Sequence, residues 1–113
     1  MSTETPDPLA AVCARFAPGW EPCVSVGAGW DQIVLDLDAA LAEVAPECRY
    51  EQIKEKFGGL RVHVVGGNPE AEKLIREAEL RAARTCEECG SAGSMRVSPR
   101  GWRGVLCPSC VRR

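Results

Sequence analysis

"CEECGSAGSMRVSPRGWRGVLCPSC" (residues 86–110) contains two Cys-x-x-Cys pairs with seventeen residues between them. This spacing is typical of a site in which four thiolates hold one tetrahedral zinc ion. Between the pairs, SMRV, SPRG and WRGVL read as a strand, a turn and a strand. We therefore predict a C-terminal zinc ribbon over residues 86–113. Its single Zn²⁺ would be bound by Cys86, Cys89, Cys107 and Cys110.

Four protein ligands leave no open coordination position, so this zinc would be structural and not catalytic. The ribbon has few apolar residues, and in comparable peptides the metal supplies about 10–16 kcal/mol of folding free energy. We therefore expect chelation to unfold the ribbon and to leave the rest of the chain largely helical. Two alternatives stay open: a pair of thioredoxin-like dithiols, which would need its own strand–helix setting, and an iron–sulfur cluster.

Residues 1–85 are expected to form a small α+β lobe made of helices and a β-hairpin. A short helix is predicted over residues 8–16, ended by Pro18-Gly19, after a loose start that carries Pro6 and Pro8 among polar residues. Residues 31–46 place apolar side chains at intervals of three and four, which indicates an amphipathic helix that stops at Pro46. The acidic residues of this segment fall mostly on its other face, which we interpret as a solvated face.

Residues 48–67 (CRYEQIKEKFGGLRVHVVGG) allow two interpretations in their first half. Tyr50, Ile53 and Phe57 have helical spacing, whereas alternation along residues 51–57 favours a strand. We favour a hairpin that turns at residues 57–59, with a second strand over residues 60–65. "KFGGLR" lacks the lysine–hydroxyl pair of a phosphate-binding loop and is interpreted as the turn.

The next predicted helix begins with Asn68 as N-cap and Pro69 at its first position, with Glu70 and Glu72 in the first turn. It continues to Thr85. It therefore runs into the cysteine cluster with no linker between them.

Length, charge and cysteine content limit the class of protein. A chain of 113 residues is long enough for one core and a stapled appendage. It has no apolar run of membrane-spanning length and no basic secretory leader, and its seven cysteines are an odd number, so we expect a cytoplasmic protein. Residues 1–80 carry seven Lys and Arg against fourteen Asp and Glu, whereas residues 81–113 carry seven Arg against two Glu. This asymmetry predicts two parts with different surfaces, the basic one C-terminal.

The other cysteines, Cys13, Cys23 and Cys48, and the single histidine, His63, are scattered over fifty residues. We interpret the three cysteines as small buried hydrophobic residues and His63 as a polar-face ring. A second metal site built from these four residues is the alternative. No nucleophile or paired acid is evident, so we predict that the protein is not an enzyme, with a nuclease or redox activity as the exception.

The predicted ribbon is basic, and an exposed tryptophan among arginines suits phosphate contacts and base stacking. Six residues are candidates for partner binding: Arg96, Arg100, Trp102, Arg103, Arg112 and Arg113. The first hypothesis is therefore a nucleic-acid-binding module. The second is an adaptor or inhibitor that binds a protein, with zinc purely structural, because zinc ribbons serve both uses. Trp102 packing over the ribbon is the alternative to stacking. Neither a membrane nor a small-molecule substrate is expected as a partner.

The order of features resembles a family of small uncharacterised proteins common in bacteriophage and prophage genomes. The resemblance rests on "GAGW" before a helix, "QIKEKFGGLRV", "CEECG" and "GWRGVLC", and covers roughly residues 27–110. Residues 1–26 lie outside it and are expected to be a variable extension. The resemblance implies a zinc-binding tail and a mobile-element setting, such as transcriptional control, host takeover or counter-defence, in the cytoplasm of the host cell.

Overall fold

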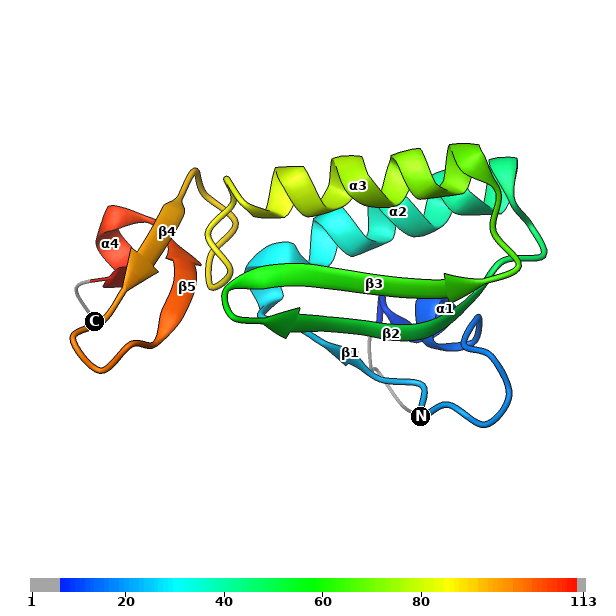
Figure 1. Ribbon diagram of the computed structural model, residues 1–113, viewed down its shortest axis with the longest axis horizontal. Coiled ribbons are helices and arrows are strands. Elements are labelled where there is room, and N and C mark those ends of the chain that lie inside the picture. Colours follow the sequence, from blue (N-terminus) through cyan, green and yellow to red (C-terminus); the bar gives the residue numbers. More distant parts are fainter. Residues whose placement is uncertain (1–6, 112–113) are drawn as a thin grey trace, which may run out of the picture.

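The computed structural model describes residues 7–111. An α+β lobe occupies most of the molecule, and a small two-stranded ribbon lies at one end of it (Figure 1). The elements in chain order are α1 (Ala10–Cys13), β1 (Val24–Ser25), η1 (Ala28–Trp30), α2 (Asp31–Val44), β2 (Arg49–Lys56), β3 (Gly59–Val65), α3 (Pro69–Ala82), β4 (Ser94–Val97), β5 (Arg103–Leu106) and α4 (Pro108–Val111). The predicted α+β class is confirmed.

Helices α2 and α3 lie side by side over the three-stranded sheet, whose strand order is β1-β2-β3 (Figure 1). Each helix buries one apolar stripe, which comprises Ile33, Val34, Leu37 and Leu41 in α2 and Ala71, Ile75, Ala78 and Ala82 in α3. These stripes meet the inward side chains of β2 and β3 in one core. Within residues 7–111, no helix has both the length and the apolar character needed to cross a bilayer.

Asn68 fixes the start of α3 as predicted. Its side-chain oxygen accepts a hydrogen bond from the backbone N–H of Ala71 at 2.8 Å, and Pro69 follows it. Its side-chain amide also donates to the carbonyl oxygen of Val44 at 2.9 Å, at the end of α2. One side chain therefore caps one helix and anchors it to the end of the other.

The hairpin interpretation of residues 48–67 is confirmed, because β2 and β3 pair in antiparallel fashion around Phe57-Gly58. The register shifts between Tyr50 and Gln52, which is a β-bulge. The bulge places Tyr50 and Ile53 on the same buried face although they are three residues apart. This explains why the segment also fits a helical period. Phe57 leaves the alternation: it lies in the turn at φ 53° and is exposed.

The N-terminal segment differs from its prediction. The helix expected over residues 8–16 is only the four residues of α1. Residues after it are drawn toward the start of β2, because Tyr50 N–H donates to the Arg15 carbonyl at 3.0 Å and Ala17 N–H donates to the Tyr50 carbonyl at 2.7 Å. Strand β1, parallel to β2, was not predicted. Val12 is buried in the main core, so this segment is built into the lobe.

The ribbon hairpin forms as predicted, with β4 and β5 antiparallel and Met95 opposite Val105. Its turn is closed by hydrogen bonds from Ser98 N–H to the Trp102 carbonyl and from Gly101 N–H to the Ser98 carbonyl, both at 2.8 Å. Val105 is fully buried and belongs to the main hydrophobic core of the lobe. The ribbon therefore packs on the lobe through an apolar side chain as well as through the chain connection.

Candidate metal centre

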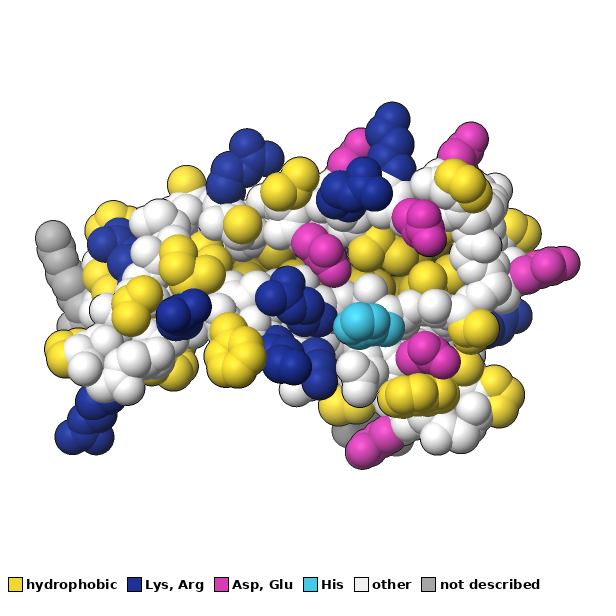
Figure 2. All heavy atoms as spheres, in the orientation of Figure 1, with side chains coloured by type: hydrophobic (Ala, Val, Ile, Leu, Met, Phe, Trp, Pro, Cys, Tyr) yellow, Lys and Arg dark blue, Asp and Glu magenta, His cyan; other side chains and the backbone are white. Residues whose placement is uncertain are grey.

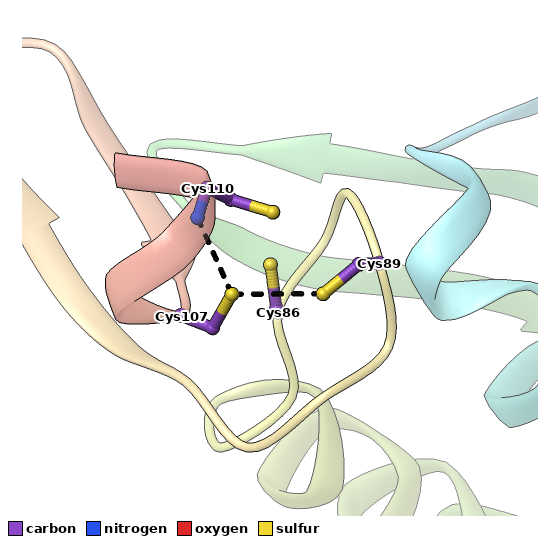
Figure 3. A group of neighbouring side chains, drawn as sticks. All are labelled: Cys86, Cys89, Cys107 and Cys110. Atoms are coloured by element: carbon purple, nitrogen blue, oxygen red, sulfur yellow. Dashed lines mark hydrogen bonds between the residues drawn. The ribbon is translucent and has the colours of Figure 1, made fainter. Parts of the chain in front are cut away.

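The four predicted ligands converge at the base of the ribbon. Cys86 and Cys89 lie in the loop after α3, Cys107 follows β5, and Cys110 lies in α4 (Figure 3). Their sulfur atoms all lie within 4.8 Å of one another, and the Cys89 and Cys107 sulfurs are 3.6 Å apart. All four are free thiols. Tetrahedral coordination with metal–sulfur bonds of about 2.3 Å holds sulfurs about 3.8 Å apart, so the cluster has the size of a single-ion site.

The first cysteine pair lies on a tight turn held by its own backbone. Gly90 N–H donates to the Cys86 carbonyl at 2.9 Å, and Cys86 N–H donates to the Ser91 carbonyl at 2.7 Å. Gly90 has φ 84°, a conformation that favours glycine and explains the residue after the second cysteine. In the second pair, the backbone N–H of Cys110 points at the Cys107 sulfur, 3.4 Å away. In this second pair, a backbone donor therefore points toward thiolate charge.

The surroundings of the cluster lower the pKa of the Cys86 and Cys89 thiols and raise the pKa of the Cys110 thiol. Hydrogen bonds from the Ser91 side chain and backbone lower the pKa of the Cys89 thiol to about 6. Burial opposes ionisation of Cys86, but backbone N–H groups, led by that of Cys89, outweigh it and lower its pKa. The neighbouring Cys107 and burial raise the pKa of Cys110. A divalent cation at the centre would offset this mutual repulsion, because all four sulfurs would then share its charge.

The site is closed on most sides. Cys86, Cys107 and Cys110 are buried, whereas Cys89 is exposed. Four protein sulfurs fill the coordination shell of a tetrahedral ion and leave no position for water or substrate. The donor set therefore fits an ion that holds the ribbon together, and the predicted ligands are the residues that the structure brings into one cluster.

The turn before α2 docks on the first cysteine pair, a contact that the sequence reasoning missed. Glu87 receives two hydrogen bonds there: Gly29 N–H donates to its carbonyl at 2.7 Å and Gly27 N–H to its carboxylate at 2.9 Å. A Cβ at Gly29 would collide with the Cys86 carbonyl oxygen. Burial raises the pKa of Glu87, opposed by the Gly27 hydrogen bond. In the sequence, the signal for this contact is the pair of glycines in "VGAGW", which are two positions apart.

The candidate binding residues of the ribbon lie on different surfaces. Arg100 and Arg103 are exposed, whereas Arg96 is half-buried. Arg96 pairs with Gly104, one register position from the Val97–Arg103 pair, so Arg96 and Arg103 lie on opposite faces of the hairpin. Arg112 and Arg113 lie outside the described residues.

Trp102 is partly exposed and partly packed on the ribbon. Its side chain is 55% exposed, yet its ring lies across the backbone of Gly104, where a Cβ would strike it. It borders a cavity of about 690 Å³ that Arg96, Glu87 and Val111 also line. The cavity brings Trp102 and Arg96 together but does not include Arg100 or Arg103.

The remaining cysteines and the histidine do not form a second cluster. Within residues 7–111, the only group of three or more potential ligands is the four-cysteine site. Cys48 is buried as expected, but Cys13 is half-buried and Cys23 is exposed, so the interpretation as buried hydrophobic residues is wrong for Cys23. Cys23 lies next to the short strand β1, beside the exposed loop before it. His63 lies on the exposed face of β3, in agreement with its prediction.

Comparison with protein-family models, with curated proteins and with solved structures found no match. The geometry of the cysteine site and the surfaces around it are therefore the basis for a functional conclusion.

Proposed function

We propose that the four cysteines bind one Zn²⁺ per chain and that this ion is structural. The observation that supports this most directly is the spacing of the four sulfurs, all within 4.8 Å of one another. A four-iron cluster would place iron and sulfide between the thiolates and hold them farther apart. In a redox dithiol, the two cysteines of the same Cys-x-x-Cys pair would contact each other. Here the short sulfur–sulfur contact joins Cys89 of one pair to Cys107 of the other.

We further propose that the ribbon hairpin contacts nucleic acid. Arg100 and Arg103 are exposed, and among residues 7–111 neither forms an ion pair. Exposed guanidinium groups without acidic partners are free to bind phosphates, and the exposed part of Trp102 can stack on a base. The resemblance to phage and prophage proteins supports a regulatory role in a mobile element. We propose no enzymatic activity, because the sequence shows no nucleophile or paired acid.

The alternative is an adaptor or inhibitor that binds a host or phage protein. It is favoured by two apolar side chains on the hairpin, Met95 and Val97, which are 47% and 61% exposed. They lie on the same face as Arg103, because Val97 is its cross-strand partner. A protein partner would bury this apolar pair, whereas nucleic acid would mainly neutralise the arginines.

Fluorescence anisotropy separates the two functions. The zinc-loaded protein is titrated into labelled DNA and RNA of random sequence across a salt series. We expect binding that weakens steeply with salt, and we expect Arg100→Ala with Arg103→Ala to flatten the log–log slope by about 0.7 per contact on single strands. Val97→Ser is the matched control on the same hairpin and should leave the slope unchanged. No binding at low salt would exclude nucleic acid and favour the adaptor.

A further inference from the structure

We propose that the outer face of the β2–β3 hairpin binds single-stranded nucleic acid together with the ribbon. This inference rests on the nucleic-acid function proposed above and assigns it a second surface and a substrate class. The basic strand face, as we name it, comprises Gln52, Lys54, Lys56, Arg61 and His63. It lies on the side of the sheet opposite the buried residues Ile53, Leu60 and Val62.

The register of the hairpin places like charges opposite each other. Lys54 is the cross-strand partner of Arg61, and Lys56 is that of Gly59. The Arg61 guanidinium lies 3.3 Å from the position of a Cβ on Gly59, so it reaches along β3 toward the turn and Lys56. Directly opposed cations such as Lys54 and Arg61 destabilise a hairpin. Among residues 7–111, neither of them nor Lys56 forms an ion pair. An anionic partner would remove this repulsion.

Within residues 7–111, the nearby carboxylates form no ion pair with these cations. Glu55 is the partner of buried Leu60, so it leaves the sheet on the other face, and its carboxylate accepts a hydrogen bond from Gly58 N–H at 2.6 Å. Glu79 of α3 accepts from Val62 N–H at 3.3 Å. Glu51 lies on the same outer face, because the bulge turns both Glu51 and Gln52 away from the buried side. With Glu21 it lines a cavity that Lys54 also lines, but within residues 7–111 neither carboxylate forms an ion pair. Figure 2 shows Lys and Arg side chains gathered in the middle of this side of the molecule.

Phe57 adds an exposed aromatic ring to the end of the basic strand face. It is 71% exposed and adopts φ 53°, a conformation that bulky residues rarely adopt. The Lys56 ammonium lies 5.8 Å from its ring centroid. Cations beside an exposed ring are the combination that binds single strands, since the ring stacks on an unpaired base while the cations contact phosphates. Bases of a duplex are already stacked on one another, so the ring favours single strands.

The turn also connects the basic strand face to the ribbon. A Cβ at Gly58 would meet the Met95 side chain at 2.8 Å and the Gly104 backbone at 3.2 Å. Met95 shares its face of the β4–β5 hairpin with Arg103, so this arginine belongs to the ribbon face that meets the turn next to Phe57. One strand of nucleic acid can therefore follow Arg61, Phe57 and Arg103 in turn.

Anisotropy with labelled oligo-dT, oligo-U and a duplex of the same length tests this surface. Lys54→Ala with Arg61→Ala should flatten the salt slope on single strands by about 1.4. Phe57→Asn, which tolerates the same backbone conformation, should weaken single-strand binding about tenfold at constant salt and change duplex binding little. Lys73→Ala with Arg76→Ala on exposed positions of α3 is the charge-matched control and should change neither.

The outcomes separate this inference from the function on which it rests. If the hairpin variants bind like the wild type while Arg100→Ala with Arg103→Ala weakens binding, the basic strand face is refuted and the ribbon function stands. If the duplex binds as tightly as single strands and Phe57→Asn has no effect, the single-strand assignment is refuted. If the zinc-loaded wild type binds none of the three probes, both proposals are refuted. Circular dichroism and zinc content of each variant confirm that it is folded.

Discussion

The indole N–H of Trp30 donates a hydrogen bond to the carbonyl oxygen of Thr85, 2.8 Å away. Trp30 is fully buried in the lobe, and Thr85 is the residue before the first cysteine of the cluster. Together with the Gly29–Glu87 hydrogen bond, this contact holds the loop of the first cysteine pair against the turn before α2. We therefore expect metal binding at the cluster to be linked to the stability of the lobe through these residues.

Gly29→Ala should destabilise the zinc-loaded protein by about 1–3 kcal/mol. The added Cβ would collide with the Cys86 carbonyl oxygen and displace the loop of the first cysteine pair from the lobe. Urea unfolding followed by circular dichroism measures the loss. Gly67→Ala is the matched control, since a Cβ there makes ordinary contacts at 3.4 Å and 3.6 Å. Equal stability of the two variants would show that the close approach at Gly29 has no energetic role.

Removing the metal should unfold the ribbon and lower the melting temperature of the helices without abolishing their signal. The stripes of α2 and α3 keep their own core, but Val105 leaves it and the Trp30–Thr85 contact is lost. This keeps the expectation from the sequence that the rest of the chain stays largely helical and adds a loss of its thermal stability. Thermal melts monitored by helical circular dichroism, with and without a chelator, measure the effect. An unchanged helical melting temperature would mean that the ribbon and the lobe are energetically independent.

We predict that the folded protein loses stability at alkaline pH because of the buried Tyr50 phenol. Burial, followed by its 2.6 Å hydrogen bond to Asp38, raises the pKa of this phenol far above its ordinary value of 10.0. The unfolded chain therefore releases the proton above about pH 10 while the folded chain retains it, and stability falls by up to about 1.4 kcal/mol per pH unit. Tyr50→Phe should remove this part of the pH dependence in urea unfolding curves. Because Tyr50 is the only tyrosine, phenolate absorbance reports it alone; a phenolate signal near pH 10 in the folded protein would contradict the prediction.

Zinc content should distinguish the four ligands from the other three cysteines. Each single Cys→Ser change at the cluster should remove the ion, because a three-sulfur site loses both charge and closure. Joint replacement of Cys13, Cys23 and Cys48 by Ala should retain one zinc per chain. Elemental analysis of the purified variants gives the answer. Loss of zinc from the triple variant would show that the ligands are misassigned.

The metal site was predictable from sequence because Cys-x-x-Cys spacing is local: the ligands of each pair are positioned by a single turn. Helices α2 and α3 and the second hairpin strand were predictable for the same reason, since apolar periodicity and the Asn68 cap act within one element. The bulge at Tyr50 and the two-residue strand β1 were not, because both depend on pairing with distant chain. Docking of Gly29 on Cys86 is likewise a tertiary contact, and its glycine has no local sequence signature beyond a turn.

The basic strand face shows the same limit. Lys54 and Arg61 are seven positions apart in the sequence and belong to no recognisable motif. Only the hairpin register makes them cross-strand partners. The charge asymmetry of the sequence indicates only the C-terminal arginines as a basic surface. In the folded chain, Lys54 and Arg61 of the acidic N-terminal part lie together on the outer face of the sheet. Glu55, between Lys54 and Lys56 in the sequence, lies on the other face.

X-ray absorption at the zinc edge of the purified protein reports directly on the coordination of the ion. We predict one zinc per chain with a first shell of four sulfur atoms at about 2.3 Å and no nitrogen or oxygen ligand. The closed cluster of Cys86, Cys89, Cys107 and Cys110 supplies all four. A shell containing nitrogen or oxygen, or a protein purified without zinc, would contradict a closed structural site.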